Sequence, residues 1–246
     1  MSAPARVVVH PSKQALADGI AARLVTALID ALAERGSAEI SLTGGSMGSA
    51  FITSLTRTPA AEAVDWSRVG VWWGDERYLP SGDPDRNDTQ NDAAGLLDLG
   101  LDPDRVHRVA GPDRSASVEA SATAYEEDLR AHGGGLFDVV ILGVGPDGHI
   151  ASLFPGHPAS TTSDGIAIAV HDSPKPPPTR VSLTRECLER SRSVWFVVSG
   201  ADKAVAVRRG VDGDDYARTP AAHVHGLEET LWLVDETAAS ELPARA

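Results

Sequence analysis

The feature that most constrains the fold of this chain is an apolar run that leads directly into a glycine-rich turn. The run covers residues 139–142 of the segment DVVILGVGPDGHIASLFPGHP, residues 138–158. A short strand that is apolar at every position is typical of a parallel sheet covered on both faces. Asp147 and His149 follow the end of this strand, where open α/β sheets bind their ligands. Taken alone, the Asp-Gly-His motif is also compatible with an ordinary surface turn.

The rest of the chain alternates strand patterns with helix patterns. Further strands are expected at residues 6–10, 39–42, 69–73, 106–109, 166–170, 194–198 and 231–234. Helices are expected from a Ser12 N-cap to a stop at Gly36, then at 46–55, near 96–97, at 115–132 and at 203–209, with loops at 81–92 and 173–178. This order predicts one α/β domain over residues 1–246, with a doubly wound, mainly parallel sheet and helices on both faces.

Composition limits the partners of this chain. Its net charge of −13 opposes binding to nucleic acid or to an anionic membrane. No apolar run approaches the roughly 20 residues that cross a bilayer, and the N-terminus lacks a basic segment followed by an apolar one. The single cysteine, Cys187, excludes an intramolecular disulfide and is expected to be a small buried residue. We expect a cytoplasmic monomer without nucleic-acid or membrane partners.

Four turns with polar residues each follow an expected strand. They lie around Ser46, Arg77, His149 and Lys203. Because the carboxyl ends of parallel strands meet at one edge of a sheet, we expect these turns to lie close together despite their separation in sequence.

Several residues in these turns suit an anionic ligand. Gly44, Gly45 and Ser46 form a strand–glycine turn–helix layout that offers backbone N–H groups to a phosphate, although a tight turn without a ligand is an equal reading. Arg180 and Lys203 are candidate cations for a phosphate, and solvated surface cations are the alternative. The acid and base groups in residues 75–77, which include Asp75 and Arg77, are candidates too, with mutual ion pairing as the simpler explanation.

His149 is the candidate for proton transfer. It is the one histidine set in a glycine turn directly after a buried strand, and an imidazole pKa of about 6.5 suits acid–base work near neutrality. A metal is the rival interpretation, but His157 lacks a convincingly spaced partner, and His223 and His225 fit one face of a short exposed strand. We expect no metal at the site.

Five segments together resemble the 6-phosphogluconolactonase family: SLTGGS (41–46), GDERYLP (74–80), ILGVGPDGHIASLFPGHP (141–158), TRVSLT (179–184) and SGADKA (199–204). The resemblance implies an α/β fold shared with glucosamine-6-phosphate isomerase/deaminases. It also implies hydrolysis of 6-phospho-D-glucono-1,5-lactone to 6-phospho-D-gluconate, the second step of the oxidative pentose phosphate pathway, without a cofactor. One departure is Met47-Gly48, where family members often carry Thr-Pro.

The resemblance also implies roles for the candidate residues. His149 would act as the general base that later returns its proton, and Asp147 would orient it or bind sugar hydroxyls. Arg77 would stabilise charge or hold the phosphate. The remaining substrate-binding candidates are Gly44, Gly45, Ser46, Asp75, Arg180 and Lys203.

Two other functions stay open from the sequence. One is an amino-sugar phosphate deaminase/isomerase, which resembles this chain in the glycine turn and Asp-Gly-His; there a catalytic glutamate usually occupies the position of Phe154. The other is a sugar-phosphate sensor without turnover, for which the expected DNA-binding module is not apparent ahead of the first strand.

Overall fold

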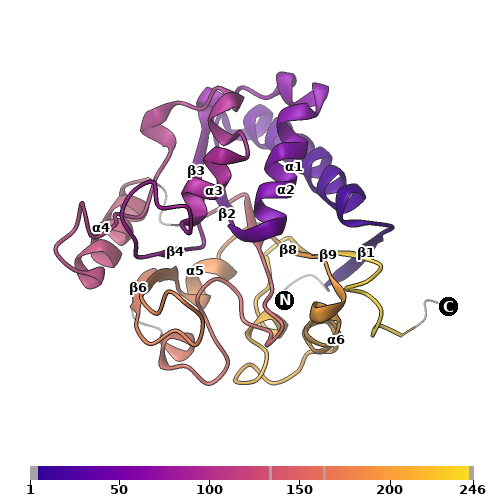
Figure 1. Cartoon of the computed structure of the whole chain (residues 1–246). Helices are drawn as coiled ribbons and strands as arrows, with labels where there is room; N and C mark the ends of the chain where they lie inside the picture. The colour runs from indigo at the N-terminus through magenta and orange to yellow at the C-terminus, as the bar shows by residue number, and fades with distance from the viewer. Residues whose placement is uncertain (1–4, 133–134, 163–164, 244–246) are drawn as a thin grey trace.

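The centre of the computed structural model, which describes residues 5–132, 135–162 and 165–243, is a six-stranded sheet (Figure 1). The strand order is β1-β9-β8-β5-β2-β3, and all neighbouring strands are parallel. The strands are β1 (Arg6–His10), β2 (Ala38–Leu42), β3 (Val69–Trp73), β5 (Val139–Leu142), β8 (Ser193–Val198) and β9 (Glu229–Asp235). From β2 the chain continues outward to β3, and from β5 it continues outward to β8 on the other side, so the strand order switches direction at the middle of the sheet.

Both faces of this sheet are covered by helices. Alternate residues of β5 pack on opposite sides: Val139 and Ile141 belong to one buried cluster, and Val140 and Leu142 to the other. Helices α1 (Lys13–Arg35) and α2 (Gly45–Arg57) contribute to the first cluster; α4 (Val118–Ala131), α5 (Arg185–Glu189) and α6 (Ala204–Asp212) contribute to the second. The predicted doubly wound α/β fold is confirmed.

Local sequence signals explain where the first helix begins and ends. The Ser12 hydroxyl caps α1 by accepting a hydrogen bond from the N–H of Ala15. Gly36 ends the helix with a φ of 80°, a conformation that favours glycine. Both were predicted, and so was the burial of Cys187 within α5.

A second, antiparallel sheet was not predicted. It contains β4 (Asp75–Arg77), β7 (Arg180–Leu183) and β6 (Ala167–Val170), in the order β4-β7-β6. Residues expected to form a turn after β3 therefore form an edge strand, and the proline-rich loop at 173–178 connects β6 to β7. Because β4 pairs with β7, Arg77 lies opposite Arg180. Two cations about a hundred residues apart thereby come together.

Four further expectations need correction. Residues 106–109 form no strand; only Val106 makes an isolated bridge to Val71. The loop expected at 81–92 contains the start of a short helix, α3 (Asn87–Ala93), and the helix expected near 96–97 is a 3₁₀ turn, Leu96–Leu99. The segment with His223 and His225 follows a 3₁₀ turn, Pro220–Ala222, and is not a strand. Two residues of the glycine run expected to end α4, 133 and 134, lie outside the described residues.

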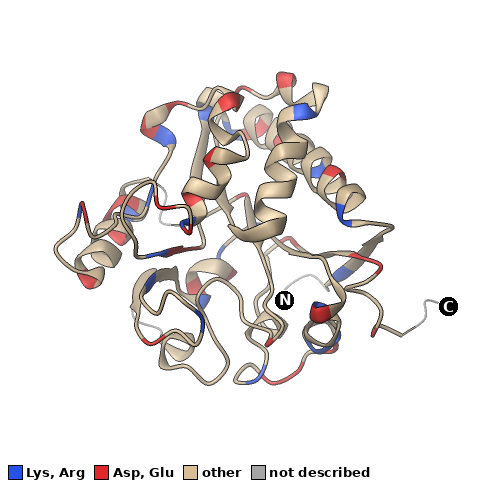
Figure 2. Ribbon diagram, viewed as in Figure 1, with Lys and Arg blue, Asp and Glu red and all other residues tan. Residues whose placement is uncertain are grey.

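Charged residues are distributed over the whole ribbon. Figure 2 shows acidic and basic positions interspersed along the helices and loops rather than gathered on one basic face. Within the described ranges, every helix is too short or too polar to cross a membrane.

Candidate active site

The four predicted turns line one cavity of about 270 Å³ at the carboxyl ends of the central strands. The cavity lies beyond β2, β5 and β8, where the strand order switches direction and where such sheets bind ligands. Eight of the nine predicted site residues line it: Gly44, Gly45, Ser46, Asp75, Arg77, His149, Arg180 and Lys203. The ninth, Asp147, contacts the cavity through His149.

His149 and Asp147 form a hydrogen-bonded pair in the turn after β5. The imidazole Nδ1 lies 2.5 Å from Oδ1 of Asp147. Since a carboxylate can only accept, Nδ1 carries the proton and Nε2 holds the lone pair of the neutral ring. Burial raises the pKa of Asp147, but the hydrogen bond and charge of His149, together with Lys175, outweigh it and hold that pKa well below its usual value. Asp147 is therefore a fixed negative charge behind the imidazole.

The close approach of this pair to the backbone requires glycine at position 145. A Cβ at Gly145 would lie 2.0 Å from Nδ1 of His149 and 2.4 Å from Oδ1 of Asp147. The glycine pattern that drew attention to this turn thus has a physical reason, because a side chain here would displace the imidazole.

Lys175 completes the polar group around His149, and the sequence reasoning missed it. Its Nζ lies 3.2 Å from Oδ1 of Asp147 and 3.2 Å from Nδ1 of His149. The residue comes from the proline-rich loop between β6 and β7, which carried no motif. One signal was present: the chain has only three lysines, and two of them, Lys175 and Lys203, line this cavity.

Arg180 is buried and already engaged by protein groups. Its side chain is 5% exposed, and its guanidinium donates to the carbonyl oxygens of Lys175, Pro176 and Pro177 at 3.1 to 3.2 Å. Nη1 lies 3.7 Å from Oδ2 of Asp75. The guanidinium thus holds the main chain that carries Lys175.

Phe154 packs directly beneath these groups. Its ring is 1% exposed, and the ring centroids of Phe154 and His149 are 4.5 Å apart. The guanidinium carbon of Arg180 lies 5.7 Å from the centre of the same ring. The position that would carry a glutamate in the deaminase pattern is therefore filled by an apolar ring.

Asp75 and Arg77 differ in how completely their side chains are hydrogen-bonded within the protein. Asp75 accepts hydrogen bonds from Ser152 Oγ at 2.6 Å and Asn87 Nδ2 at 3.2 Å, which satisfies its buried carboxylate. Arg77 donates through Nη1 to the carbonyl oxygen of Asp85, but its buried Nε has no hydrogen-bond partner. A buried donor without a partner is costly unless a ligand supplies an acceptor.

The glycine turn after β2 begins helix α2 at the cavity. Gly44 is the N-cap and supplies no side-chain cap, so the first helical N–H groups are directed to this end. The N–H of Gly45 already donates to Oε1 of Gln90 at 2.9 Å. The positive end of the α2 dipole, with Lys203 lining the same cavity, produces a local positive potential in an acidic protein.

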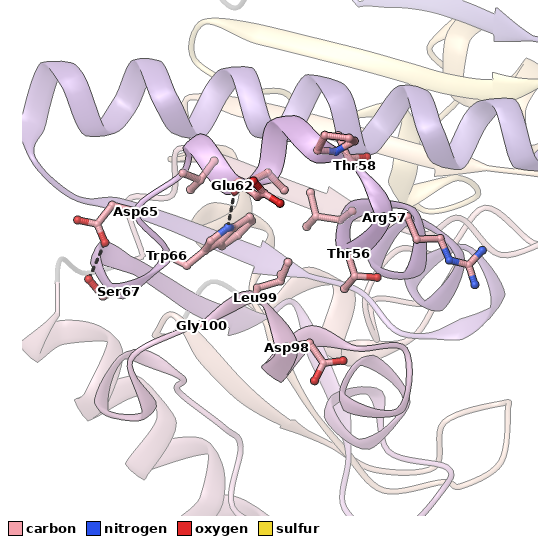
Figure 3. A pocket seen from close by; sticks show the side chains of 14 residues that line it. Thr56, Arg57, Thr58, Glu62, Asp65, Trp66, Ser67, Asp98, Leu99 and Gly100 are labelled. Carbon is pink, nitrogen blue, oxygen red and sulfur yellow. Dashed lines mark hydrogen bonds between the residues drawn. The ribbon is translucent and has the colours of Figure 1, made fainter.

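A larger cavity, of about 640 Å³, lies at the opposite end of α2 (Figure 3). Its lining includes Arg57, Glu62, Asp65 and Asp98 but none of the predicted site residues. It faces the negative end of the α2 dipole and three carboxylates, which disfavour an anionic ligand. The smaller cavity remains the candidate for a phosphorylated substrate.

Comparison with known proteins gives a consistent result. The family model described as "Glucosamine-6-phosphate isomerases/6-phosphogluconolactonase" matches residues 11–232. A Streptomyces coelicolor protein named 6-phosphogluconolactonase is 47% identical, with 99% of this chain and 97% of that protein covered. The structure of 6-phosphogluconolactonase from Trypanosoma brucei is 26% identical, with a TM-score of 0.82 and coverage of 99% and 100%.

The same fold occurs in a second enzyme class. A monomeric glucosamine-6-phosphate deaminase is similar in structure, with a TM-score of 0.79, 24% identity and coverage of 96% of this chain and 99% of that one. At this identity the likeness concerns the fold alone, so residues of the site must separate the two activities.

Proposed function

Because the chain belongs to the glucosamine-6-phosphate isomerase/6-phosphogluconolactonase family, we propose that it hydrolyses 6-phospho-D-glucono-1,5-lactone to 6-phospho-D-gluconate. This is the second step of the oxidative pentose phosphate pathway. The 47% identity to a 6-phosphogluconolactonase over almost the whole chain carries the assignment to the lactonase branch. Phe154 beside His149 supports it, since a phenyl ring cannot replace a carboxylate in amino-sugar chemistry.

His149 is the general base in this proposal. Its Nε2 accepts a proton from a water molecule, whose oxygen forms a bond to C1 of the lactone. The negative charge of Asp147 stabilises the imidazolium that results and keeps the ring oriented through Nδ1. When the bond between C1 and the ring oxygen breaks, the imidazolium returns its proton to that oxygen. The sugar acid leaves with an open chain and His149 is neutral again.

Arg77, Lys203 and the N-terminus of α2 hold the phosphate in this proposal. The Nε of Arg77 has no partner, and the ammonium of Lys203 lies 3.3 Å from the exposed carboxylate of Asp202, which leaves donors for phosphate oxygens. Both residues line the cavity with Ser46. Charge-assisted hydrogen bonds of this kind are the strong ones.

Arg180 is assigned a positioning role rather than a phosphate contact. Its guanidinium donates to three carbonyl groups of the loop that carries Lys175. Lys175 in turn keeps a positive charge 3.2 Å from Asp147. This arrangement favours an ionised Asp147, the group that accepts the hydrogen bond from Nδ1 of His149.

Timed conversion of fresh lactone tests the assignment directly. Formation of 6-phosphogluconate, measured with a coupled dehydrogenase, should exceed the spontaneous rate in proportion to enzyme concentration. A rate equal to the spontaneous one at every enzyme concentration would contradict the proposal and favour a sensor without turnover. We further propose a monomer of one domain acting in the cytoplasm; light scattering on the purified chain tests the monomer.

A further inference from the structure

We propose that His107, Asp128 and His132 form a second site, which binds one divalent transition-metal ion. The three residues are separate from the candidate active site, since none of them lines its cavity. Their ligand atoms lie within 4.8 Å of one another, and within the described residues no other such group of three was found. We call them the 107/128/132 site.

The distances in the 107/128/132 site are close to those of a coordination sphere. Nδ1 of His107 lies 2.8 Å from Oδ2 of Asp128, and Nδ1 of His132 lies 2.9 Å from Oδ1 of the same carboxylate. Two ligands at about 2.1 Å from a tetrahedral Zn²⁺ ion are about 3.4 Å apart, roughly 0.5 Å more than these distances. Little movement is therefore needed for all three side chains to reach one ion.

The ligands are held in place before an ion arrives. His107 is 7% exposed, and its ring stacks on Trp72 with a centroid distance of 3.7 Å and an angle of 4°. Its backbone N–H donates to the carbonyl of Val71 in β3. Asp128 and His132 are one turn apart at the end of α4, so they project from the same side of the helix.

The donor set indicates the class of ion. Two imidazoles and one carboxylate suit Zn²⁺, Ni²⁺ or Cu²⁺, whereas Mg²⁺ and Ca²⁺ prefer oxygen ligands. Without an ion, each Nδ1 lies within hydrogen-bond distance of acceptor oxygens of Asp128 and carries the ring proton. Binding of a metal ion would displace that proton, and the neutral imidazole would then carry its proton on Nε2. His132 is 50% exposed, so the site is open to solvent and water can complete the coordination.

The 107/128/132 site lies toward the amino edge of the main sheet, away from the substrate cavity. The indole Nε1 of Trp72, on which His107 stacks, donates to Oε2 of Glu39 near the start of β2. The cavity lies beyond the other end of β2. An ion here would tie the end of α4 to the segment beside β3 and should stabilise the folded chain without entering the reaction.

The proposal is tested by calorimetric titration with Zn²⁺. The sample is the full, untagged chain, which is first treated with a chelator and then dialysed. Wild type should bind one ion per chain saturably, with a higher unfolding temperature in Zn²⁺. His132→Gln should weaken Zn²⁺ binding by about tenfold or more. Even the mutation of a residue that only supports a metal ligand typically lowers metal affinity by about 10- to 100-fold. His107→Gln should weaken Zn²⁺ binding to a similar extent. If this buried substitution prevents folding, the Zn²⁺ affinity of His132→Gln, at a half-exposed position, tests the proposal.

Two matched variants control for other histidines. His171→Gln removes an imidazole that pairs with Glu119 at 2.7 Å near the start of α4, and His149→Gln removes the active-site imidazole. Neither should change Zn²⁺ affinity or stoichiometry. Absence of saturable binding in wild type, or unchanged affinity in His132→Gln, would overturn the proposal. In either case the trio only joins α4 to the neighbouring segment by hydrogen bonds.

Discussion

The imidazole Nδ1 of His149 donates a hydrogen bond to Oδ1 of Asp147 across 2.5 Å, within a single turn of the chain. The two residues are separated only by Gly148, and Lys175 lies 3.2 Å from both polar atoms. This relationship assigns the proton to Nδ1 and leaves Nε2 as the atom that can act as a base.

Asp147→Asn should therefore reduce turnover by about 10²- to 10⁴-fold, the range of a positioned general base. The new amide can donate a hydrogen bond to Nδ1 of His149, which shifts the ring proton to Nε2. Nε2 then has no lone pair with which to accept a proton from water. The pKa of Asp147 is depressed, so the wild-type carboxylate remains ionised as pH falls through the ordinary range of aspartate, and its stabilising effect is lost only at lower pH. A pH–rate profile of both proteins checks this. Equal turnover in Asp147→Asn and wild type would contradict the role of the pair.

Gly145→Ala should lower turnover by about 100-fold, because a misplacement near 1 Å is enough for such an effect. The added Cβ would lie 2.0 Å from Nδ1 of His149 and must displace the ring. Gly143→Ala is the matched control, since its Cβ would meet Thr43 Oγ1 at an ordinary 3.5 Å. Steady-state rates of the two variants should differ strongly, and similar losses in both would argue against displacement of His149 as the cause.

Much of the fold was predictable because its signals are local. Five of the six strands of the main sheet carry apolar runs, and β2 alternates apolar with polar residues. Ser12 and Gly36 show where α1 begins and ends. The second sheet was missed because β4 (Asp75–Arg77) is three polar or charged residues, without apolar alternation. It becomes a strand only through pairing with β7, more than a hundred residues later. A single sequence does not encode such a pairing in any local pattern.

The residues of the candidate site were predictable where they lie in local motifs, and were missed where the second sheet brings them in. Residues in glycine turns after strands were found, because parallel strands bring those turns to one edge. Lys175 was missed because it lies in a loop between two strands of the unpredicted second sheet. For the same reason the contacts of Arg180 could not be predicted: its guanidinium donates to the carbonyl groups of that loop.

Lys203→Ala should raise KM for the phosphorylated lactone far more than it lowers kcat. The loss of one charge-assisted contact, about 1.5 to 3 kcal/mol, corresponds to roughly 10- to 150-fold in binding. The unphosphorylated lactone should be a poor substrate for wild type and indifferent to this change. Lys13→Ala, an exposed lysine at the start of α1, serves as control. Equal losses on both lactones would show that Lys203 does not serve the phosphate.

Glucosamine 6-phosphate should release no ammonia in the presence of this protein, even at high enzyme concentration. Phe154, whose ring lies 4.5 Å from that of His149, can neither ionise nor orient the imidazole by a hydrogen bond. An ammonia assay on the preparation that hydrolyses the lactone provides the measurement. Stoichiometric ammonia release would move the chain to the deaminase branch of its family.

The most direct test of the central claim is the value of kcat/KM for 6-phosphogluconolactone in His149→Gln, corrected for spontaneous hydrolysis. Glutamine fills similar space but cannot take up a proton near neutral pH, so a folded variant with the wild-type unfolding temperature should lose about 10²- to 10⁴-fold. If His149→Gln, equally folded, retained wild-type kcat/KM, His149 would not be the general base.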